Sequence, residues 1–463
     1  MARQRCKGYC GKSYMRRDKF LYRGTLVAST ILFILIFNWT YSAVIAPVYD
    51  SWGLSKNSTP WPYLFVSWVV CIVPSLWMPV RIERPSQLFF LIQYYVIFIP
   101  ACFILYNVSK PVITEDSALM LIILMFLGLS VLQSVYYVPL IRIKYLRIHT
   151  RWFWFSFIVL LFSLVTYLIA AFGSDFYLAN LEDIYTVRSA LAGAISQRGN
   201  CFGFYAQMWL AGFFFPLCFA VGARAKRWWL IAVAMAGYLL LYGLGGSKTT
   251  LFSFIYFPAI ILWLIYIKKN TIPVFMLGLC FLLVLGICLR MIGLEHVAYW
   301  YTAVVNFRTF SIPAQMIAQH YEFFNHNALT YMSHVNILKS FIPFPYDMDI
   351  PRTIGMYFYN APVGANAGFW ASDGIAGFGP IGIILMSFVC AFIFWVFDSM
   401  AKRYDPRFVI ISATFIATTF ANTPLPTTLV SGGLGFLFVA LWLLPKKSLV
   451  RDGYRSPYGP AQG

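Results

Sequence analysis

The chain has 463 residues, of which 60% are hydrophobic, 19% aromatic and only 11% charged, and its mean hydropathy is +0.72. Because soluble domains carry roughly 25% charged residues, this composition excludes a soluble enzyme, a disordered scaffold and a secreted disulfide-rich module. The formal net charge of +19 would favour nucleic-acid binding in a soluble protein, but in the remaining class, a polytopic membrane protein, its meaning depends on where the charges lie.

Apolar segments of about 20 residues, long enough to cross a bilayer core as helices, recur along the whole chain. They predict twelve membrane spans, at residues 24–46, 63–79, 86–106, 117–140, 152–172, 202–222, 228–243, 250–267, 272–290, 378–397, 408–422 and 425–444. The first segment is too long for a removable signal peptide and lacks a small-residue cleavage site. We therefore expect an all-α fold, with residues 1–463 forming one transmembrane domain.

One set of connections between the predicted spans is short and basic, and all members of this set fall on one side if the spans alternate. They carry Arg81 and Arg84, Arg142 to Arg151, Arg224 to Arg227, Lys268 and Lys269, and Lys402 to Arg407. The positive-inside rule then places both termini in the cytoplasm. That side holds 26 basic and 5 acidic residues (+21), and the outer side holds 9 and 11 (−2), which together give +19. The excess charge thus indicates orientation and contact with anionic membrane lipids, and no nucleic-acid partner is expected.

Two outer connections are long, at residues 173–201 and 291–377. A loop of this second length is uncommon unless it has a function. The first part of that loop, residues 304–338, has apolar side chains at helical spacing: Phe307, Phe310, Ile317, Tyr321 and Phe324. This spacing predicts amphipathic helices on the outer face of the membrane.

Six outer cations lie at predicted span ends or in these loops, where the positive-inside rule disfavours them. They are Arg188, Arg198, Lys248, Arg290, Arg308 and Arg352. One explanation is pairing with acidic neighbours such as Asp175, Glu182, Asp183 or Glu295. The other explanation is that these side chains converge on an anion. The rigid donor fork of arginine suits phosphate or pyrophosphate.

Two further motifs have ordinary structural explanations. Asp347-Met-Asp349 has the form of the metal-holding pair of nucleotide-sugar glycosyltransferases, but neighbouring prolines favour a turn, and no metal site or other cofactor is predicted. The glycine-rich segment ending at Lys248 fails the phosphate-loop pattern because Ser247 separates the lysine from the glycines. We expect it to be a break between two helices that presents Lys248.

Three segments resemble the Wzy-type polymerases of O-antigen and related repeat-unit polysaccharides. The loop from Leu181 through Arg188 to Gly199 is similar to an R-x10-G motif of that family. Gly245-Gly-Ser-Lys248 stands where the family has Gly-Ser/Thr-Arg, with lysine as a departure. The most specific match runs from Asn306 to Pro313 and from Ala365 to Gly382, and the whole resemblance covers about residues 175–385. Arg352 and Gly364 form a similar pair, but eleven residues separate them where the R-x10-G motif has ten.

The resemblance implies a multi-span glycosyltransferase of the lipid-linked-donor type (GT-C-like) in the bacterial inner membrane. Such an enzyme moves a growing glycan from undecaprenyl pyrophosphate onto a lipid-linked repeat unit in the periplasm. Residues 173–201 and 291–377 would then be its first and its large periplasmic loop. The reaction is expected to need no metal, and a chain-length regulator of the polysaccharide co-polymerase type is an expected partner.

The resemblance also implies roles for individual residues. Arg188 and Arg308 would stabilise the negative charge that develops on the pyrophosphate leaving group, and Asp373 would be the general base for the acceptor hydroxyl. The residues expected to bind substrate are Arg198, Lys248, Arg352, Glu322, His320 and Asn366, with Glu322 and His320 as alternative bases.

Two other functions remain open from the sequence. An O-antigen ligase uses a similar donor and also has a large outer loop, but it transfers the glycan to lipid A-core. A transporter or flippase of lipid-linked sugars would instead place charged residues within spans and show repeated halves. The segments from Arg308 to Pro313 and from Asn366 to Gly379 favour the polymerase.

Overall fold

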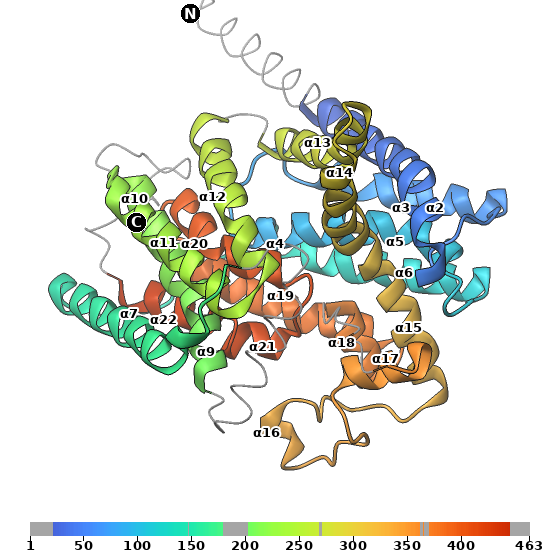
Figure 1. Ribbon diagram of the computed structural model, residues 1–463. Helices are drawn as coiled ribbons and strands as arrows, with labels where there is room; N and C mark the ends of the chain where they lie inside the picture. The colour runs from blue at the N-terminus through green and yellow to red at the C-terminus, as the bar shows by residue number, and fades with distance from the viewer. Residues whose placement is uncertain are drawn as a thin grey trace, which may run out of the picture.

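The computed structural model describes residues 22–146, 148–178, 202–267, 271–361, 364 and 370–444. Every regular element in these ranges is a helix, and one isolated antiparallel bridge pairs Leu54 with Val108. The expected all-α fold is therefore confirmed for the described part of the chain (Figure 1).

The first third of the chain contains the centre of the bundle. Its elements are a helix at Tyr22–Trp52 (which includes η1 Tyr41–Ile45, α2 Ala46–Tyr49 and η2 Asp50–Trp52), α3 (Trp61–Trp77), α4 (Ser86–Ile92), η3 (Gln93–Phe98), α5 (Ile99–Ile104), η4 (Leu105–Asn107) and α6 (Glu115–Ser134). The helix Ser86–Asn107, which runs from α4 to η4, is hydrophobic on all sides. Every residue from 86 to 106 is buried. Such a helix needs protein neighbours all round, and it packs against α3, α6, α15, α19 and α20.

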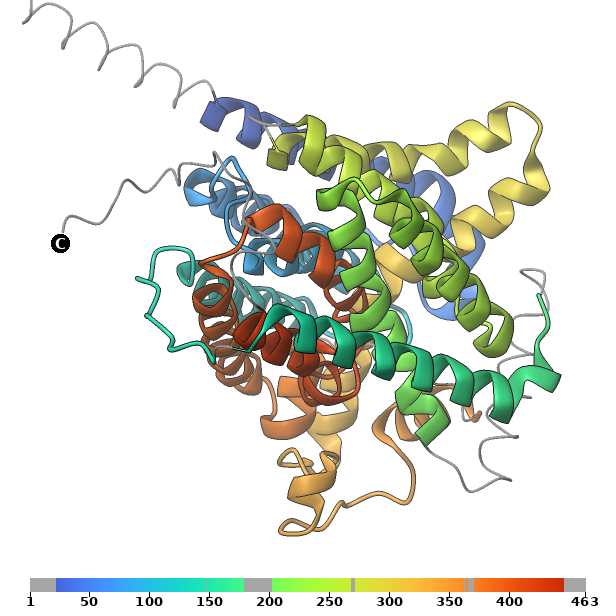
Figure 2. The ribbon, with the colours of Figure 1, turned by 90° about the vertical axis from the view of Figure 1, so that its left-hand side faces the viewer.

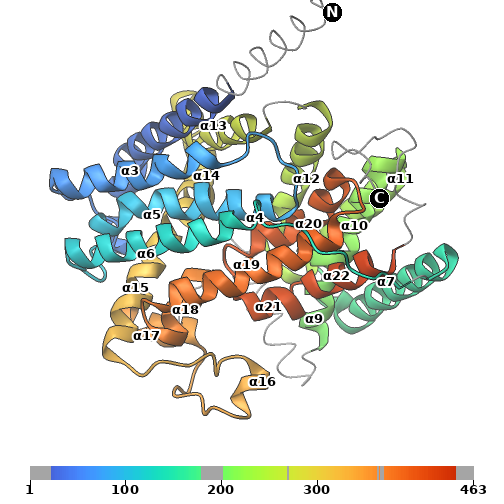
Figure 3. The same cartoon turned by 180° about the vertical axis from the view of Figure 1, so that it is seen from behind.

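The middle third supplies one flank of the bundle. Its elements are α7 (Thr150–Phe172), η5 (Gly173–Asp175), α9 (Phe202–Trp209), η6 (Leu210–Phe214), α10 (Phe215–Ala225), α11 (Trp228–Gly245), α12 (Lys248–Tyr266) and α13 (Thr271–Met291). Helix α7 lies at the edge of the molecule in Figures 1 and 3, and it crosses the front of the other helices in Figure 2. Many of its side chains, among them Phe155 and Phe162, are exposed and apolar, which fits a helix that faces lipid.

The last third carries the large predicted loop and then returns to the bundle. Its elements are α14 (Glu295–Tyr301), η7 (Thr302–Ser311), α15 (Ile312–His326), α16 (Asn336–Lys339), α17 (Ile350–Tyr359), α18 (Trp370–Phe378), α19 (Gly382–Ala401), α20 (Pro406–Thr419), α21 (Leu425–Val430) and α22 (Leu434–Leu443). The segment with α16 projects beyond the packed helices (Figures 1 and 3).

Each of the twelve predicted spans contains a helix, but these helices differ in length. In the described ranges, nine helices are long and apolar enough to cross a membrane, which indicates a multi-pass membrane protein. Helices α3, α20 and α22 are shorter, with 17, 14 and 10 residues. The expectation of one continuous helix over 425–444 was wrong: the chain turns at Gly433, whose φ of 93° favours glycine, and α21 and α22 are separate. The number of spans stays a prediction.

Connections that alternating spans would place on the same side contact each other. On the predicted cytoplasmic side, contacts join Arg84 Nη1 to Val138 O (3.2 Å), Tyr145 OH to Met400 O (3.2 Å) and Arg224 Nη1 to Asp405 Oδ2 (3.1 Å). On the predicted outer side, they join Ser55 N to Asn107 O (2.9 Å), Tyr63 OH to Asp116 Oδ1 (2.7 Å) and Lys110 Nζ to Ser51 O (3.0 Å). Which side faces the cytoplasm stays a prediction.

Glycines allow α18 and α19 to cross at backbone contact. A Cβ atom built on Gly382 would overlap the carbonyl oxygen of Gly374, and one built on Gly374 would overlap Gly382. We expect Gly382→Ala to lower the free energy of unfolding by about 1–3 kcal/mol or more, because the obstacle is backbone that cannot rotate away. Thermal unfolding of the purified protein in detergent would show this as a lower midpoint. The control is Gly278→Ala in α13, where a Cβ meets nothing within 4 Å. Equal midpoints for the two variants would contradict the packing argument.

Candidate functional site

The predicted amphipathic helix of the large loop is present as a nearly continuous helical segment, formed by α14, η7 and α15. Three of the five apolar residues that predicted it, Phe310, Ile317 and Phe324, are buried. The continuous helix ends at His326, and the remaining part of the expected range, up to residue 338, contains only the beginning of the short α16. Its middle portion, η7, is a π-helix, as are η1, η3 and η6 elsewhere in the described ranges.

Arg308 lies in the last turn of η7 and is exposed. The backbone on both sides of it is held in place. Phe307 stacks on Tyr49 with ring centroids 3.9 Å apart, and buried Asn306 donates from Nδ2 to the Leu283 carbonyl at 2.8 Å. The neighbours of Arg308 thus hold the backbone at this position, and the residue itself is exposed.

The helices that carry five of the predicted site residues contact each other. Helix α15 continues from η7 and packs against both α17 and α18. Two backbone bonds also join the chain after α15 to α18: Thr330 N donates to Ala376 O (2.9 Å) and Tyr331 N donates to Gly377 O (3.2 Å). The elements of Arg308, His320, Glu322, Arg352 and Asp373 therefore form one unit.

Asp373 is buried in α18, with 4% of its surface exposed. Its Oδ2 atom accepts a hydrogen bond from the backbone N–H of Leu425 at 2.9 Å, at the start of α21. Burial raises the pKa of the Asp373 carboxyl to about 8, and the bond from Leu425 opposes this shift only in part. A substantial share of Asp373 is therefore protonated near neutral pH, and the group joins two helices whether or not it acts as a base.

The two alternative bases have different surroundings. His320 is buried, its Nδ1 lies 2.7 Å from the Met316 carbonyl oxygen, and burial lowers its pKa to about 4. The imidazole is therefore neutral at physiological pH. Glu322 is partly exposed and lies 3.3 Å from His326 Nε2, one helical turn further on. Of the two, Glu322 is the more accessible to a ligand.

Arg352 has an acidic neighbour. Its Nε atom lies 3.7 Å from Oδ1 of Asp349, and both side chains are more than half exposed. Exposed pairs at this distance hold each other weakly, so Arg352 can exchange this carboxylate for another anion. Asp349, one of the two residues of the D-x-D motif, thus has an arginine as its neighbour. Within the described ranges, no three His, Cys, Asp or Glu residues are grouped so as to hold a metal ion.

Lys248 begins α12, directly after a turn in which Gly246 has a φ of 56°. The expected break between two helices is confirmed. The chain leaving α7 meets this turn, because Tyr177 N donates to Gly243 O at 2.9 Å. The entry to the first long outer loop is therefore anchored next to Lys248. Helix α12 packs on α11, α13 and α20, so Lys248 belongs to a different part of the bundle from α15, α17 and α18.

Three predicted site residues, Arg188, Arg198 and Asn366, lie outside the described residues, as does the Arg188-to-Gly199 motif. Their predicted roles stay predictions.

The structure adds a buried polar cluster that the sequence reasoning missed. Gln315 and Gln319 are fully buried on α15, and their Nε2 atoms donate to the Tyr359 hydroxyl of α17 at 3.1 and 2.7 Å. Gln315 also donates to the Trp52 carbonyl, and Gln319 donates to the Lys110 carbonyl at 3.1 Å. The cluster therefore fixes α15 and α17 against two other outer connections. The feature of the sequence that could have predicted this cluster is a pair of glutamines one helical turn apart on an apolar helix face.

Comparisons of the chain with family models, with curated proteins and with solved structures yield no match. The resemblance to Wzy-type polymerases therefore stays a prediction. In the described ranges, the geometry establishes an all-helical, membrane-type bundle in which buried polar and aromatic contacts hold the chain around Arg308.

Proposed function

We propose that the chain is a glycosyltransferase that polymerises lipid-linked oligosaccharide repeat units, with an undecaprenyl-pyrophosphate donor, on the periplasmic face of a bacterial inner membrane. The product is O-antigen or a related surface polysaccharide. The observation that carries this proposal is the contact between the two parts of the most specific resembling segment. Helix α15, which begins within the Asn306-to-Pro313 part, packs on α18, which lies in the part ending at Gly382.

The chemistry of such a transfer suits this arrangement. Breaking a glycosyl–pyrophosphate bond develops negative charge on the leaving group, which a positioned arginine stabilises. Arg308 is exposed on a backbone that Asn306 and Phe307 hold in place. Glu322 and Arg352 lie on the adjoining helices as further polar groups for sugar and phosphate. The apolar bundle provides the surroundings that a polyprenyl chain requires.

The transporter alternative would be favoured by a charge that lines a path through a span. Asp398 is a buried acid in α19, three residues from the end of the helix. It accepts hydrogen bonds from the backbone N–H and hydroxyl of Ser86, at 3.0 and 2.6 Å, and so binds the first residue of α4. Through these bonds Asp398 joins α19 to α4, which accounts for its burial. Its presence in α19 therefore does not favour a transport path.

Deleting the gene in its host separates the three functions. Loss of a polymerase leaves a single repeat unit on the lipid A-core, because the ligase and flippase still act. Loss of every repeat unit on a polysaccharide gel would contradict the proposal and favour a ligase or a flippase. Incubating the purified full chain with a synthetic undecaprenyl-pyrophosphate-linked repeat unit should produce a ladder of longer products. The control reaction is the same protein with a repeat unit on undecaprenyl monophosphate, which has the poorer leaving group.

A further inference from the structure

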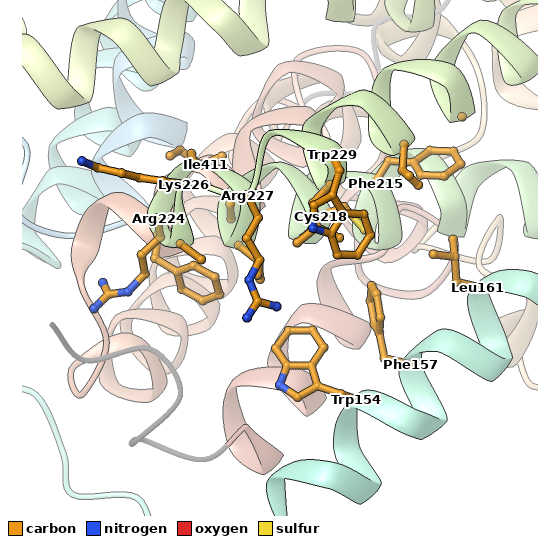
Figure 4. Close-up of a pocket in the computed structure, with 18 of the residues that line it drawn as sticks. Trp154, Phe157, Leu161, Phe215, Cys218, Arg224, Lys226, Arg227, Trp229 and Ile411 are labelled. Carbon is orange, nitrogen blue, oxygen red and sulfur yellow. The ribbon is translucent and has the colours of Figure 1, made fainter.

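A large groove separates α7 from α10 and α11, with a volume of about 1250 Å³ (Figure 4). Its walls are mostly apolar and include Trp154, Leu161 and Val165 of α7, Phe215 and Cys218 of α10, and Leu240 of α11. The volume exceeds the roughly 300–1,000 Å³ of ordinary small-molecule pockets. The groove is therefore large enough for a long apolar ligand.

The length of the groove matches one leaflet of a bilayer. Along α7 it extends from Trp154 to Val165, and along α11 from Trp229 to Leu240, which is eleven residue-to-residue steps in each case (165 − 154 and 240 − 229). At about 1.5 Å per residue this is roughly 16 Å, about half of the ~30 Å hydrocarbon core. The beginnings of α7, α11 and α20 and the end of α10 all lie at the same end of the groove.

That end of the groove is cationic. Its lining includes Arg224, Lys226, Arg227 and Arg407, with Asp405 as the one acidic residue, so these five side chains sum to +3. Asp405 pairs with Arg224 at 3.1 Å. Figure 4 shows the side chains of Arg224 and Arg227 on the same side of the α10–α11 turn, with Trp154 below Arg227.

The backbone presents these cations in a fixed turn. Lys226 adopts a left-handed conformation (φ 55°), and Arg227 N donates to the Gly222 carbonyl at 2.9 Å. This is a tight helix end that leads directly into α11. Trp228 and Trp229 follow and are 72% and 60% exposed, as is typical of aromatic residues at a membrane interface.

We propose that this groove binds one molecule of an anionic phospholipid, with its acyl chain between α7 and α11 and its phosphate at the turn formed by Arg224, Lys226 and Arg227. Charge complementarity selects this occupant. The chain's own C-terminal residues 445–463 carry four Lys or Arg and one Asp, a net charge of +3, and would be repelled. A second copy of the chain would bring further basic connections to this end. The proposal does not depend on the polymerase function.

The test uses the purified full chain in detergent and two lipids with identical acyl chains, phosphatidylglycerol and phosphatidylcholine, each with a photoreactive diazirine in the chain. We expect phosphatidylglycerol to label peptides of α7 and α11 that line the groove, and to remain bound in native mass spectrometry. The double variant Lys226→Gln/Arg227→Gln should weaken its retention by about tenfold or more, because each basic residue near an anionic lipid contributes to binding. The matched control is Arg142→Gln/Lys144→Gln, which also removes one arginine and one lysine. Both lie exposed in another basic connection.

A second pair of variants tests the apolar wall. Ala236 lines the groove on α11 and is exposed, so Ala236→Trp should block labelling without disturbing the packed core. Ala232→Trp places the same side chain at an exposed position on α11 that does not line the groove, and should leave labelling unchanged. Equal labelling by the two lipids would overturn the proposal and indicate nonspecific lipid contact. So would an equal loss of lipid retention in Arg142→Gln/Lys144→Gln, or an equal loss of labelling in Ala232→Trp.

Discussion

Replacing Arg308 with alanine is expected to abolish long polysaccharide chains while the protein remains folded and at its normal level. Arg308 is exposed, so little packing is lost, but the leaving pyrophosphate loses a positioned positive charge. Removing one such electrostatic group typically costs about 10²–10³ in rate. The measurement is the polysaccharide ladder on a gel, from deletion cells that carry the variant gene, together with the rate of the reaction of the purified protein.

Two further variants show whether the effect comes from the arginine fork itself. Arg308→Lys retains the charge but not the paired donors, and should restore short chains at a reduced rate. Lys339→Ala removes an exposed cation from α16 in the same large loop, and should leave chain length unchanged. Normal ladders in Arg308→Ala would remove Arg308 from the proposed site, and a lowered thermal midpoint would show that its role is structural.

Replacing Asp373 with asparagine is expected to stop glycan transfer without unfolding the protein. The amide oxygen of asparagine can still accept the bond from Leu425 N–H, whereas an amide cannot take a proton from an acceptor hydroxyl. A lost general base costs about 10²–10⁴ in rate. Because the pKa of Asp373 is about 8, the rate of the unsubstituted protein should rise from pH 6 to pH 8 as the carboxylate forms. A fully active asparagine variant would show that Asp373 only joins α18 to α21.

The same pKa predicts a pH dependence of stability. The folded-state pKa of about 8 lies above the ordinary value of 3.8, so the folded protein binds this proton more tightly than the unfolded chain does. The contribution of Asp373 to stability is therefore fully present below about pH 4 and is lost as the pH rises through about 8. Thermal midpoints measured across this range should fall more steeply for the unsubstituted protein than for Asp373→Asn. Parallel curves would contradict a raised pKa.

Local features of the sequence predicted the helices well, because the length and periodicity of an apolar segment are properties of neighbouring residues. Each predicted span contains a helix, and Lys248 begins α12 as the glycine-rich break indicated. At the α21–α22 break, where one continuous helix was expected, a nonlocal contact accompanies the difference. A Cβ on Gly212 of η6 would overlap the Gly432 carbonyl, so the backbones of the two segments touch.

The membrane class of the protein, the positions of its helices and the basic character of one set of connections can all be predicted from local sequence. The burial of its polar groups cannot, because burial depends on the helices that pack around a residue and not on its neighbours in the chain. Asp373 and His320 lie inside the bundle, whereas Arg308 on the adjoining turn is exposed. In the same way, the cations of the α10–α11 turn belong to a groove only because α7 lies beside them across an apolar gap.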